Sequence, residues 1–325
     1  MCEDGSIFMI DLDFGIQIEP QYGFTYDRIR EIAHEAETLG YESLWVSDHF
    51  FLTPELLNTS CLECWTTLAA LARDTKRLRI GAMVASQSYR NPALVSKMTA
   101  SLDNISGGRL NFGLGAGWKE IEYRAYGYKF SKADVRIKQL DETLRIAKLM
   151  WTQEKATFNG KYYFVEEAIC SPKPVQKPYP PIWIGGTGNY TLRVAARHAD
   201  AVNFAWTLPM EIFREKLEKL KEYCAEKNRD YKQIRKSAGL MITMAKDEET
   251  LARKVREREE KSGTPYMRYL SRQPANLIGT TDAVADRITE YCGLGVDHFI
   301  LRFHYGEEIE NMRLFVEDVM PRVLC

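Results

Sequence analysis

Short apolar runs alternate with longer amphipathic stretches along nearly the whole chain. The runs are rich in β-branched and aromatic residues, which favours buried parallel strands. They predict strands near residues 12–18, 42–48, 78–86, 109–115, 181–185, 200–205, 237–244 and 296–303. Strand and helix patterns that alternate in this way are typical of repeated βα units, and eight units predict a closed (β/α)8 TIM barrel.

Helical spacing marks the stretches between the runs. In one of them, apolar residues recur every three or four positions before Gly40, at Ile29, Ile32, Ala33, Ala36 and Leu39. This spacing predicts a helix over residues 25–39 with a C-terminal glycine stop. A further helix is predicted over residues 209–227.

The chain of 325 residues is longer than a minimal barrel of roughly 250, so one domain over residues 1–325 with insertions is expected. Residues 153–180 carry a hairpin signature around Asn159-Gly160 and then a proline-rich return. Residues 261–278 contain Gly, Pro, Tyr and Arg without periodicity. Both insertions are predicted to cover the barrel mouth as lids.

The composition of the chain limits the kinds of molecule that it is expected to bind. The formal net charge of -1 argues against nucleic acid, and no apolar window reaches the roughly 20 residues of a membrane span. The acidic start is unlike a signal peptide, and seven scattered cysteines fit reduced thiols. These features predict a cytoplasmic protein that acts on a small molecule.

Reacting groups of a closed βα barrel come from the carboxyl ends of its strands. The polar, glycine and aromatic residues at the predicted strand ends are Gln17, Glu19, Ser47, Asp48, His49, Ser86, Gln87, Gly113, Gly115, Gly117, Trp118, Asn203, Trp206, Arg302 and His304. Their common position predicts a single site at this end of the barrel.

His49 is the strongest catalytic candidate, because an imidazole beside a ring cofactor can donate a hydrogen bond or pass a proton near neutral pH. Asp48 either orients His49 or accepts from a loop N–H group. Glu19 could serve as a general acid, and Gln17, two residues earlier on the same strand face, competes with a neutral hydrogen bond.

The loop Gly185-Gly186-Thr187-Gly188 follows an apolar run and precedes a helical pattern, so its N–H groups and hydroxyl are suited to a phosphate. It matches neither the Walker A pattern nor the dinucleotide fingerprint. Cys61 and Cys64 form only half of a zinc motif and are interpreted as packing residues, so no metal site is predicted.

Three further aromatic side chains and one histidine have open interpretations. Tyr123, Tyr126 and Tyr128 either stack on a planar ligand or pack under a loop. His198 lies in a helix-to-strand connection and is interpreted as structural.

Four stretches resemble the bacterial-luciferase-like superfamily of flavin and deazaflavin enzymes. They are Ser43-Leu44-Trp45-Val46-Ser47-Asp48-His49-Phe50, Tyr89-Arg90-Asn91-Pro92-Ala93-Leu94, residues 106–118 from Ser106-Gly107-Gly108 to Gly117-Trp118, and residues 172–186 from Pro172-Lys173-Pro174 to Ile184-Gly185-Gly186. The resemblance implies a barrel, commonly dimeric, that binds FMN or coenzyme F420 at the strand ends.

The Ser-Asp-His ending is similar to the F420-using branch, which includes methylenetetrahydromethanopterin reductases, sugar-phosphate dehydrogenases and secondary alcohol dehydrogenases. This likeness implies a non-proline cis peptide near Met83-Val84 beneath the ring. The expected cofactor-binding residues are Asp48, His49, Met83, Val84, Ser86, Gly115, Gly117, Gly185, Gly186, Thr187 and Gly188.

Two positions depart from the branch. Trp118 stands where sugar-phosphate dehydrogenases place a catalytic glutamate, and Glu19 matches the reductases' first-strand glutamate only approximately. The chain is therefore predicted to transfer a hydride between F420 and a small organic substrate, such as a methylenetetrahydropterin-type C1 carrier or an alcohol. The alternatives are an FMN-dependent monooxygenase and a non-catalytic flavin-binding protein.

Overall fold

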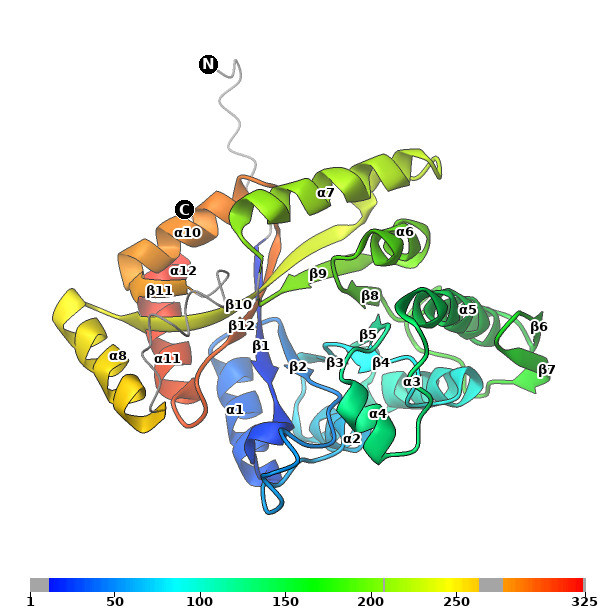
Figure 1. Ribbon diagram of the computed structural model, residues 1–325, viewed down its shortest axis with the longest axis horizontal. Coiled ribbons are helices and arrows are strands. Elements are labelled where there is room, and N and C mark those ends of the chain that lie inside the picture. The colour runs from blue at the N-terminus through cyan, green and yellow to red at the C-terminus, as the bar shows by residue number, and fades with distance from the viewer. Residues whose placement is uncertain (1–11, 207, 263–276, 324–325) are drawn as a thin grey trace.

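A closed parallel barrel forms the centre of the computed structural model, which describes residues 12–206, 208–262 and 277–323 (Figure 1). Each barrel strand pairs with its neighbours in the order β12-β1-β2-β3-β5-β8-β9-β10, and β10 pairs again with β12. The strands are β1 Asp13–Ile18, β2 Ser43–Val46, β3 Arg79–Ala82, β5 Leu110–Gly115, β8 Ile182–Gly185, β9 Ala201–Ala205, β10 Arg235–Ala245 and β12 His298–Arg302. The predicted (β/α)8 barrel is confirmed.

The predicted third strand is interrupted. The run over residues 78–86 forms β3 and a short β4, Ala85–Ser86, and the peptide bond between them, Met83-Val84, is cis as the resemblance implied. Both pieces pair with β5 in parallel. The interruption directs Val84 into the barrel at its carboxyl end, where it meets the glycines of β5 and β8.

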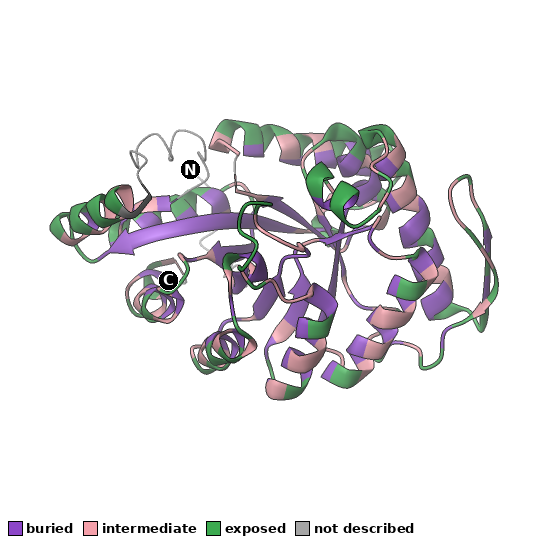
Figure 2. Ribbon diagram, turned by 60° about the horizontal axis from the view of Figure 1, so that its bottom comes forward, coloured by how far each residue is buried: buried purple, intermediate pink, exposed green. Residues whose placement is uncertain are grey.

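Helices surround the barrel and present their apolar faces to it (Figure 2). The predicted helix over 25–39 is α1, whose N-cap Thr25 accepts a hydrogen bond from Arg28 N and whose chain leaves through Gly40 at a φ of 83°. The other helices are α2 Cys64–Asp74, α3 Pro92–Ser106, α4 Glu120–Ala125, α5 Ala133–Thr152, α6 Asn189–His198, α7 Met210–Ala225, α8 Glu248–Ser262, α10 Thr281–Cys292, α11 Glu308–Leu314 and α12 Met320–Val323.

Three short irregular helical turns complete these connections. They are η1 Pro20–Tyr22, η2 Tyr231–Gln233 and η3 Phe315–Val319. No helix among the described residues combines the length and the hydrophobicity needed to cross a membrane.

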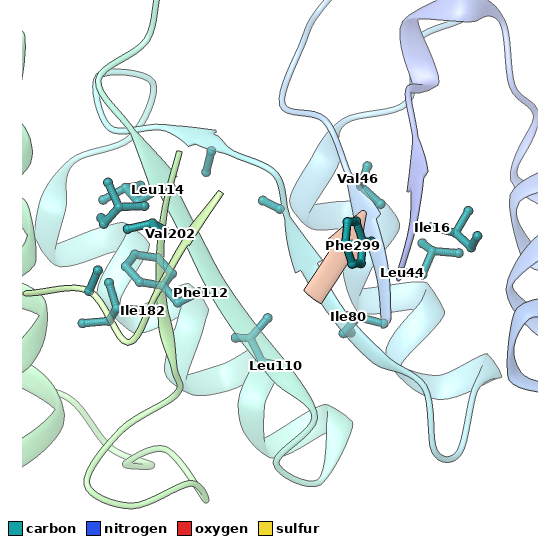
Figure 3. Close-up of a cluster of buried hydrophobic side chains, with 14 of the residues drawn as sticks. Ile16, Leu44, Val46, Ile80, Leu110, Phe112, Leu114, Ile182, Val202 and Phe299 are labelled. Carbon is teal, nitrogen blue, oxygen red and sulfur yellow. The ribbon is translucent and has the colours of Figure 1, made fainter. Parts of the chain in front are cut away.

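The main core lies between the strands and the surrounding helices (Figure 3). Side chains from alternate strand positions fill it, including Ile16, Leu44, Val46, Ile80, Leu110, Phe112, Leu114, Ile182, Val202 and Phe299. The intervening positions face the barrel interior, because successive strand residues point to opposite faces. Trp45 and Trp183 pack there, and a Cβ on Gly81 would lie 2.7 Å from the Trp45 ring.

The first insertion does not form a lid. It contains the antiparallel hairpin of β6 Lys155–Asn159 and β7 Phe164–Ile169, which packs against α5. Glu142 of α5 accepts hydrogen bonds from the backbone N–H groups at the hairpin tip, Lys161, Tyr162 and Tyr163, at 2.8–2.9 Å. No residue of 153–180 lines the cavity at the barrel mouth, so the prediction of a lid there is wrong.

Most of the second insertion, residues 263–276, lies outside the described residues. Its first part belongs to α8, and its last part begins β11, Leu277–Thr280. This strand pairs in parallel with the end of β10, where Ile242 faces Leu277.

Candidate active site

A cavity of about 590 Å³ opens at the carboxyl ends of the strands. We call it the first cavity. All eleven residues expected to bind a cofactor line it, together with Glu19. Ser47, Trp118, Asn203 and Trp206, also found at predicted strand ends, lie on the same wall. The structure thus brings together residues from β1, β2, β4, β5, β8 and β9 that are far apart in the sequence.

His49 follows β2 on the wall of this cavity, with 18% of its side chain exposed. Its Nδ1 lies 2.8 Å from Oε2 of Glu122, a fully buried carboxylate of α4. A carboxylate only accepts hydrogen bonds, so Nδ1 carries the proton in this contact and Nε2 remains for a ligand. The exposed ring of Trp118 packs edge-on to the imidazole with centroids 5.7 Å apart.

Glu122 is anchored by several donors. Its Oε1 accepts from the N–H of Phe50 at 2.9 Å and from Lys119 Nζ at 3.1 Å, and its Oε2 accepts from the Tyr89 hydroxyl at 3.1 Å. Burial raises the pKa of this carboxyl, but the His49 hydrogen bond, the Phe50 N–H and the Lys119 charge outweigh burial and lower the pKa to about 2. Glu122 is therefore an ionised, fixed support for His49.

Asp48 has other partners than the adjacent histidine. Its Oδ2 accepts from Ser86 N at 3.0 Å, and Arg90 binds both carboxylate oxygens at 2.7 and 2.9 Å. Arg90 also contacts Glu63 at 2.5 Å. Of the two alternatives, the one in which Asp48 accepts from a loop N–H group agrees with this geometry. The bidentate ion pair ties the end of β2 to β4 and to the following loop.

Glycines leave room at one wall of the cavity. A Cβ on Gly115 or on Gly185 would lie 2.7 Å from the Val84 side chain, a distance that would force a shift. Gly117, with a φ of 76°, has a different reason: a Cβ there would lie 1.9 Å from the Tyr123 hydroxyl. Val84 can approach two neighbouring strands only because both lack a side chain at that level.

The loop Gly185-Gly186-Thr187-Gly188 also lines the cavity and leads into α6. Gly186 has a φ of 122°, which favours glycine, and Gly188 is the N-cap of α6 without a side-chain hydrogen bond. The first N–H groups of α6 and the Thr187 hydroxyl are suited to an anionic group in this place.

Glu19 stands at the border of the cavity. Its Oε2 lies 2.8 Å from Arg302 Nη2, close enough for an ion pair but without hydrogen-bond geometry. Gln17, Arg302 and His304 line an adjoining cavity rather than the first one.

Other candidates from the sequence lie outside the first cavity. Tyr126 stacks on Phe50 with centroids 4.0 Å apart, and Tyr128 belongs to the same aromatic cluster. Tyr123 is fully buried and hydrogen-bonds Ser86 Oγ at 2.8 Å, so packing explains these rings.

His198, Cys61 and Cys64 also lie outside the first cavity. His198 contacts Asp141 at 3.1 Å, and burial lowers the pKa of this imidazole. Cys61 and Cys64 bond backbone carbonyls, and within the described residues no cluster of three or more His, Cys, Asp or Glu is arranged to hold a metal.

Sequence reasoning missed Glu122 and Arg90. Glu122 is in the segment Lys119-Glu120-Ile121-Glu122, where its spacing resembles an exposed helix face. Arg90 lies in the stretch of residues 89–94 that resembles the superfamily, but that stretch does not indicate its partner. No local pattern marks either as a partner, because the contacts span 73 residues to His49 and 42 residues to Asp48.

The chain belongs to the luciferase-like monooxygenase family, whose sequence profile matches residues 8–298. It is 26% identical to an FMNH2-dependent dimethylsulfone monooxygenase of Pseudomonas putida, over 94% of this chain and 90% of that protein. It is 24% identical to an F420-dependent glucose-6-phosphate dehydrogenase of Amycolatopsis mediterranei, over 90% of this chain and 93% of that protein.

Among solved structures, the fold is similar to that of an F420-dependent secondary alcohol dehydrogenase in complex with an F420-acetone adduct. The TM-score is 0.80 at 20% identity, covering 96% of this chain and 99% of that chain. Relatives that use F420 and relatives that use FMN therefore both align over nearly the whole chain.

Proposed function

We propose that this chain is an F420-dependent oxidoreductase that transfers a hydride between the deazaflavin and a small organic substrate. The observation that carries the proposal is the His49–Glu122 pair on the wall of the first cavity, where Nδ1 is held at 2.8 Å and no hydrogen bond between described residues occupies Nε2. A fixed imidazole with one nitrogen available is suited to a proton that moves with a hydride.

The residues present fit a cofactor of this class. Gly115 and Gly185 let the Val84 side chain lie close to β5 and β8, so that it can face a planar ring in the cavity, and the loop from Gly185 to Gly188 with the N-terminus of α6 would hold a phosphate. The volume of about 590 Å³ is within the usual range for cofactor sites, roughly 300–1,000 Å³. When bound, the deazaflavin would accept or donate the hydride.

The chain's own residues would manage orientation and the proton. In oxidation of an alcohol, His49 Nε2 would take the hydroxyl proton while Nδ1–H stays bonded to Glu122. In the reverse direction the same nitrogen would return it. Asp48 acts as a positioning residue, because Arg90 and Ser86 N occupy its oxygens. Glu19, paired with Arg302, is assigned to substrate positioning rather than to the predicted role of general acid.

The runner-up is an FMN-dependent monooxygenase, favoured by the 26% identity to the FMNH2-dependent relative. The same residues line the cavity in either case, so cofactor preference separates the two. A non-catalytic flavin-binding protein is the third alternative and would bind cofactor without turnover. Assembly as a homodimer or a higher homo-oligomer remains a prediction from the resemblance.

The test is a fluorescence and absorbance titration of the purified protein with coenzyme F420 and, separately, with FMN. We expect F420 to bind at least tenfold more tightly than FMN. Gly185→Ala, whose Cβ would meet Val84 at 2.7 Å, should weaken F420 binding at least tenfold. The control Gly293→Ala, at the helical C-cap of α10 and on the wall of neither cavity, should leave it unchanged.

Each alternative has its own outcome in this experiment. Tighter binding of FMN would contradict the proposal and favour the monooxygenase. Tight F420 binding, followed by failure of the reduced cofactor to exchange hydride with any of a panel of alcohols, ketones and imines, would favour the non-catalytic protein.

A further inference from the structure

A second cavity of about 400 Å³ adjoins the first at the barrel mouth. The carboxyl ends of β1 and β12 and the middle of β10 form it, and Glu19 borders both cavities. A molecule in the second cavity would therefore lie next to whatever occupies the first. The chemistry of its wall indicates what kind of molecule that is.

The charged side chains on this wall already neutralise one another. Arg302 lies 2.8 Å from Glu19, and Arg258 donates to Glu307 at 2.6 Å. Glu308, also on the wall, is bound by Arg28 at 2.8 Å. Each of these three arginines has a carboxylate partner, so the described residues of this wall carry no excess positive charge for a phosphate or a sulfonate.

His304 adds no charge either. The Thr243 hydroxyl accepts from Arg258 at 2.7 Å and also forms a hydrogen bond with His304 Nε2 at 3.0 Å, a contact that a neutral imidazole can make as donor or as acceptor. Burial, together with the charges of Arg258 and Arg302, lowers the pKa of this imidazole to about 3.

One buried side-chain oxygen on the wall has neither a hydrogen bond nor an ion pair among the described residues. Gln17 is 4% exposed, and its amide nitrogen donates only a long bond of 3.4 Å to Ile18 O. Its Oε1 has no hydrogen-bond partner among the described residues. A buried unpaired acceptor is costly to the folded state, and a ligand that donates a hydrogen bond would remove the cost.

Aromatic rings supply the remaining contact surface. Phe24 and Tyr305 meet edge to face with centroids 4.7 Å apart, and Tyr22 and Phe303 stand on the same wall. These rings suit an apolar or planar body. The second cavity thus combines an apolar surface, a balanced charge and one unpaired acceptor.

We propose that the second cavity binds the substrate as an uncharged molecule with an apolar body, whose hydroxyl or amine donates a hydrogen bond to Gln17. The proposal rests on the proposed function only in naming this molecule the substrate. It separates the chain from enzymes that take phosphorylated sugars, because such substrates need cations that are not already paired.

The test uses benzyl alcohol and benzyl phosphate as a matched pair of probes, without cofactor and with excess inorganic phosphate, which competes with benzyl phosphate for the loop of residues 185–188 in the first cavity. Saturation-transfer NMR titrations of the full chain measure both affinities. We expect millimolar binding of benzyl alcohol, as is usual for about eight heavy atoms, and at least tenfold weaker binding of benzyl phosphate. Gln17→Met should weaken benzyl alcohol binding about fivefold to tenfold. The control Gln153→Met, on an exposed residue that ends α5, should leave it unchanged.

The outcomes decide the proposal independently of the cofactor. Equal or tighter binding of benzyl phosphate to the wild-type protein would overturn the proposal. So would the absence of benzyl alcohol binding at a concentration about 20-fold above the expected Kd of about 1 mM. Unchanged affinity in a folded Gln17→Met variant would remove Gln17 as the recognising group. If that variant unfolds, the alcohol and phosphate comparison in the wild type still decides. Failure of the F420 titration leaves these results untouched.

Discussion

The two ends of the barrel each contain a glutamate beside a histidine. At the carboxyl end, Glu122 holds His49 Nδ1 at 2.8 Å. At the amino end, Glu42 lies 3.5 Å from Nε2 of His298, which is fully buried. The two pairs join the same groups, but His49 lines the first cavity whereas His298 is fully buried.

The electrostatics do not separate the pairs. Burial raises the pKa of the Glu42 carboxyl, but the neighbouring His298 and Ser43 outweigh burial, so its pKa also falls to about 2. What differs is the use of the ring. His298 has Ser237 Oγ at 2.9 Å on Nδ1 and Ser43 Oγ at 3.4 Å on Nε2, whereas no hydrogen bond between described residues occupies Nε2 of His49. Access, rather than a shifted pKa, therefore identifies the functional pair.

The largest effect is expected from the same substitution at the two histidines. The carboxamide nitrogen of His49→Asn can replace Nδ1–H toward Glu122 but cannot replace Nε2, so turnover should fall about 10²- to 10⁴-fold with little loss of stability. His298→Asn should leave turnover unchanged and lower the free energy of unfolding by about 1–3 kcal/mol, because it disturbs a buried network. Steady-state kinetics and urea denaturation of both variants measure the two effects.

A reversed pattern would break the comparison. If His49→Asn lost stability and kept turnover, the carboxyl-end pair would be structural. If His298→Asn lost turnover at unchanged stability, the sealed pair would be linked to the chemistry.

The barrel could be predicted from the sequence. Buried strands appear as apolar runs, and helices with one buried face appear as apolar residues that recur every three or four positions, so a short segment of sequence is enough to recognise either. The site could be predicted in outline for the same reason: His49 and the glycines of residues 185–188 follow recognisable strands. The ion pairs could not, because Glu122 and Arg90 act through contacts formed only when the barrel closes. The lid prediction failed because hydrogen bonds that the backbone N–H groups of the hairpin tip donate to Glu142 hold the tip against α5, and no local pattern shows these contacts.

The next effect concerns the two glutamates. Glu122 accepts hydrogen bonds from His49, Lys119, Tyr89 and two backbone N–H groups, and its side chain is fully buried. Glu122→Gln directs an amide NH2 at these donors and should lower the free energy of unfolding by about 3 kcal/mol. Glu42→Gln should lower it by only about 1 kcal/mol, because 20% of the Glu42 side chain is exposed and its histidine contact is longer. Urea denaturation at pH 7 compares them, and equal losses would show that saturation by donors does not distinguish the two ends.

The smallest effect sharpens the comparison by adding the histidine of the second cavity. The pKa of His304 is lowered from 6.5 to about 3, so between these values the unfolded chain binds a proton that the folded chain does not. Stability therefore rises with pH across this window, by at most about 1.4 kcal/mol per pH unit for one such group. His304 imposes no penalty on folding above pH 6.5, and its penalty grows as the pH falls toward 3. The two glutamates affect stability at lower pH, between about 4.5 and about 2, where protonation of their carboxyls removes the stability gained by their depressed pKa values.

Urea denaturation at several pH values between 4.5 and 6.5 thus measures mainly the histidines, and His304→Gln should reduce the slope of stability against pH by up to about 1.4 kcal/mol per unit. An unchanged slope would mean that His304 is protonated in the folded protein, which would give the second cavity the positive charge that recognition of an uncharged substrate excludes.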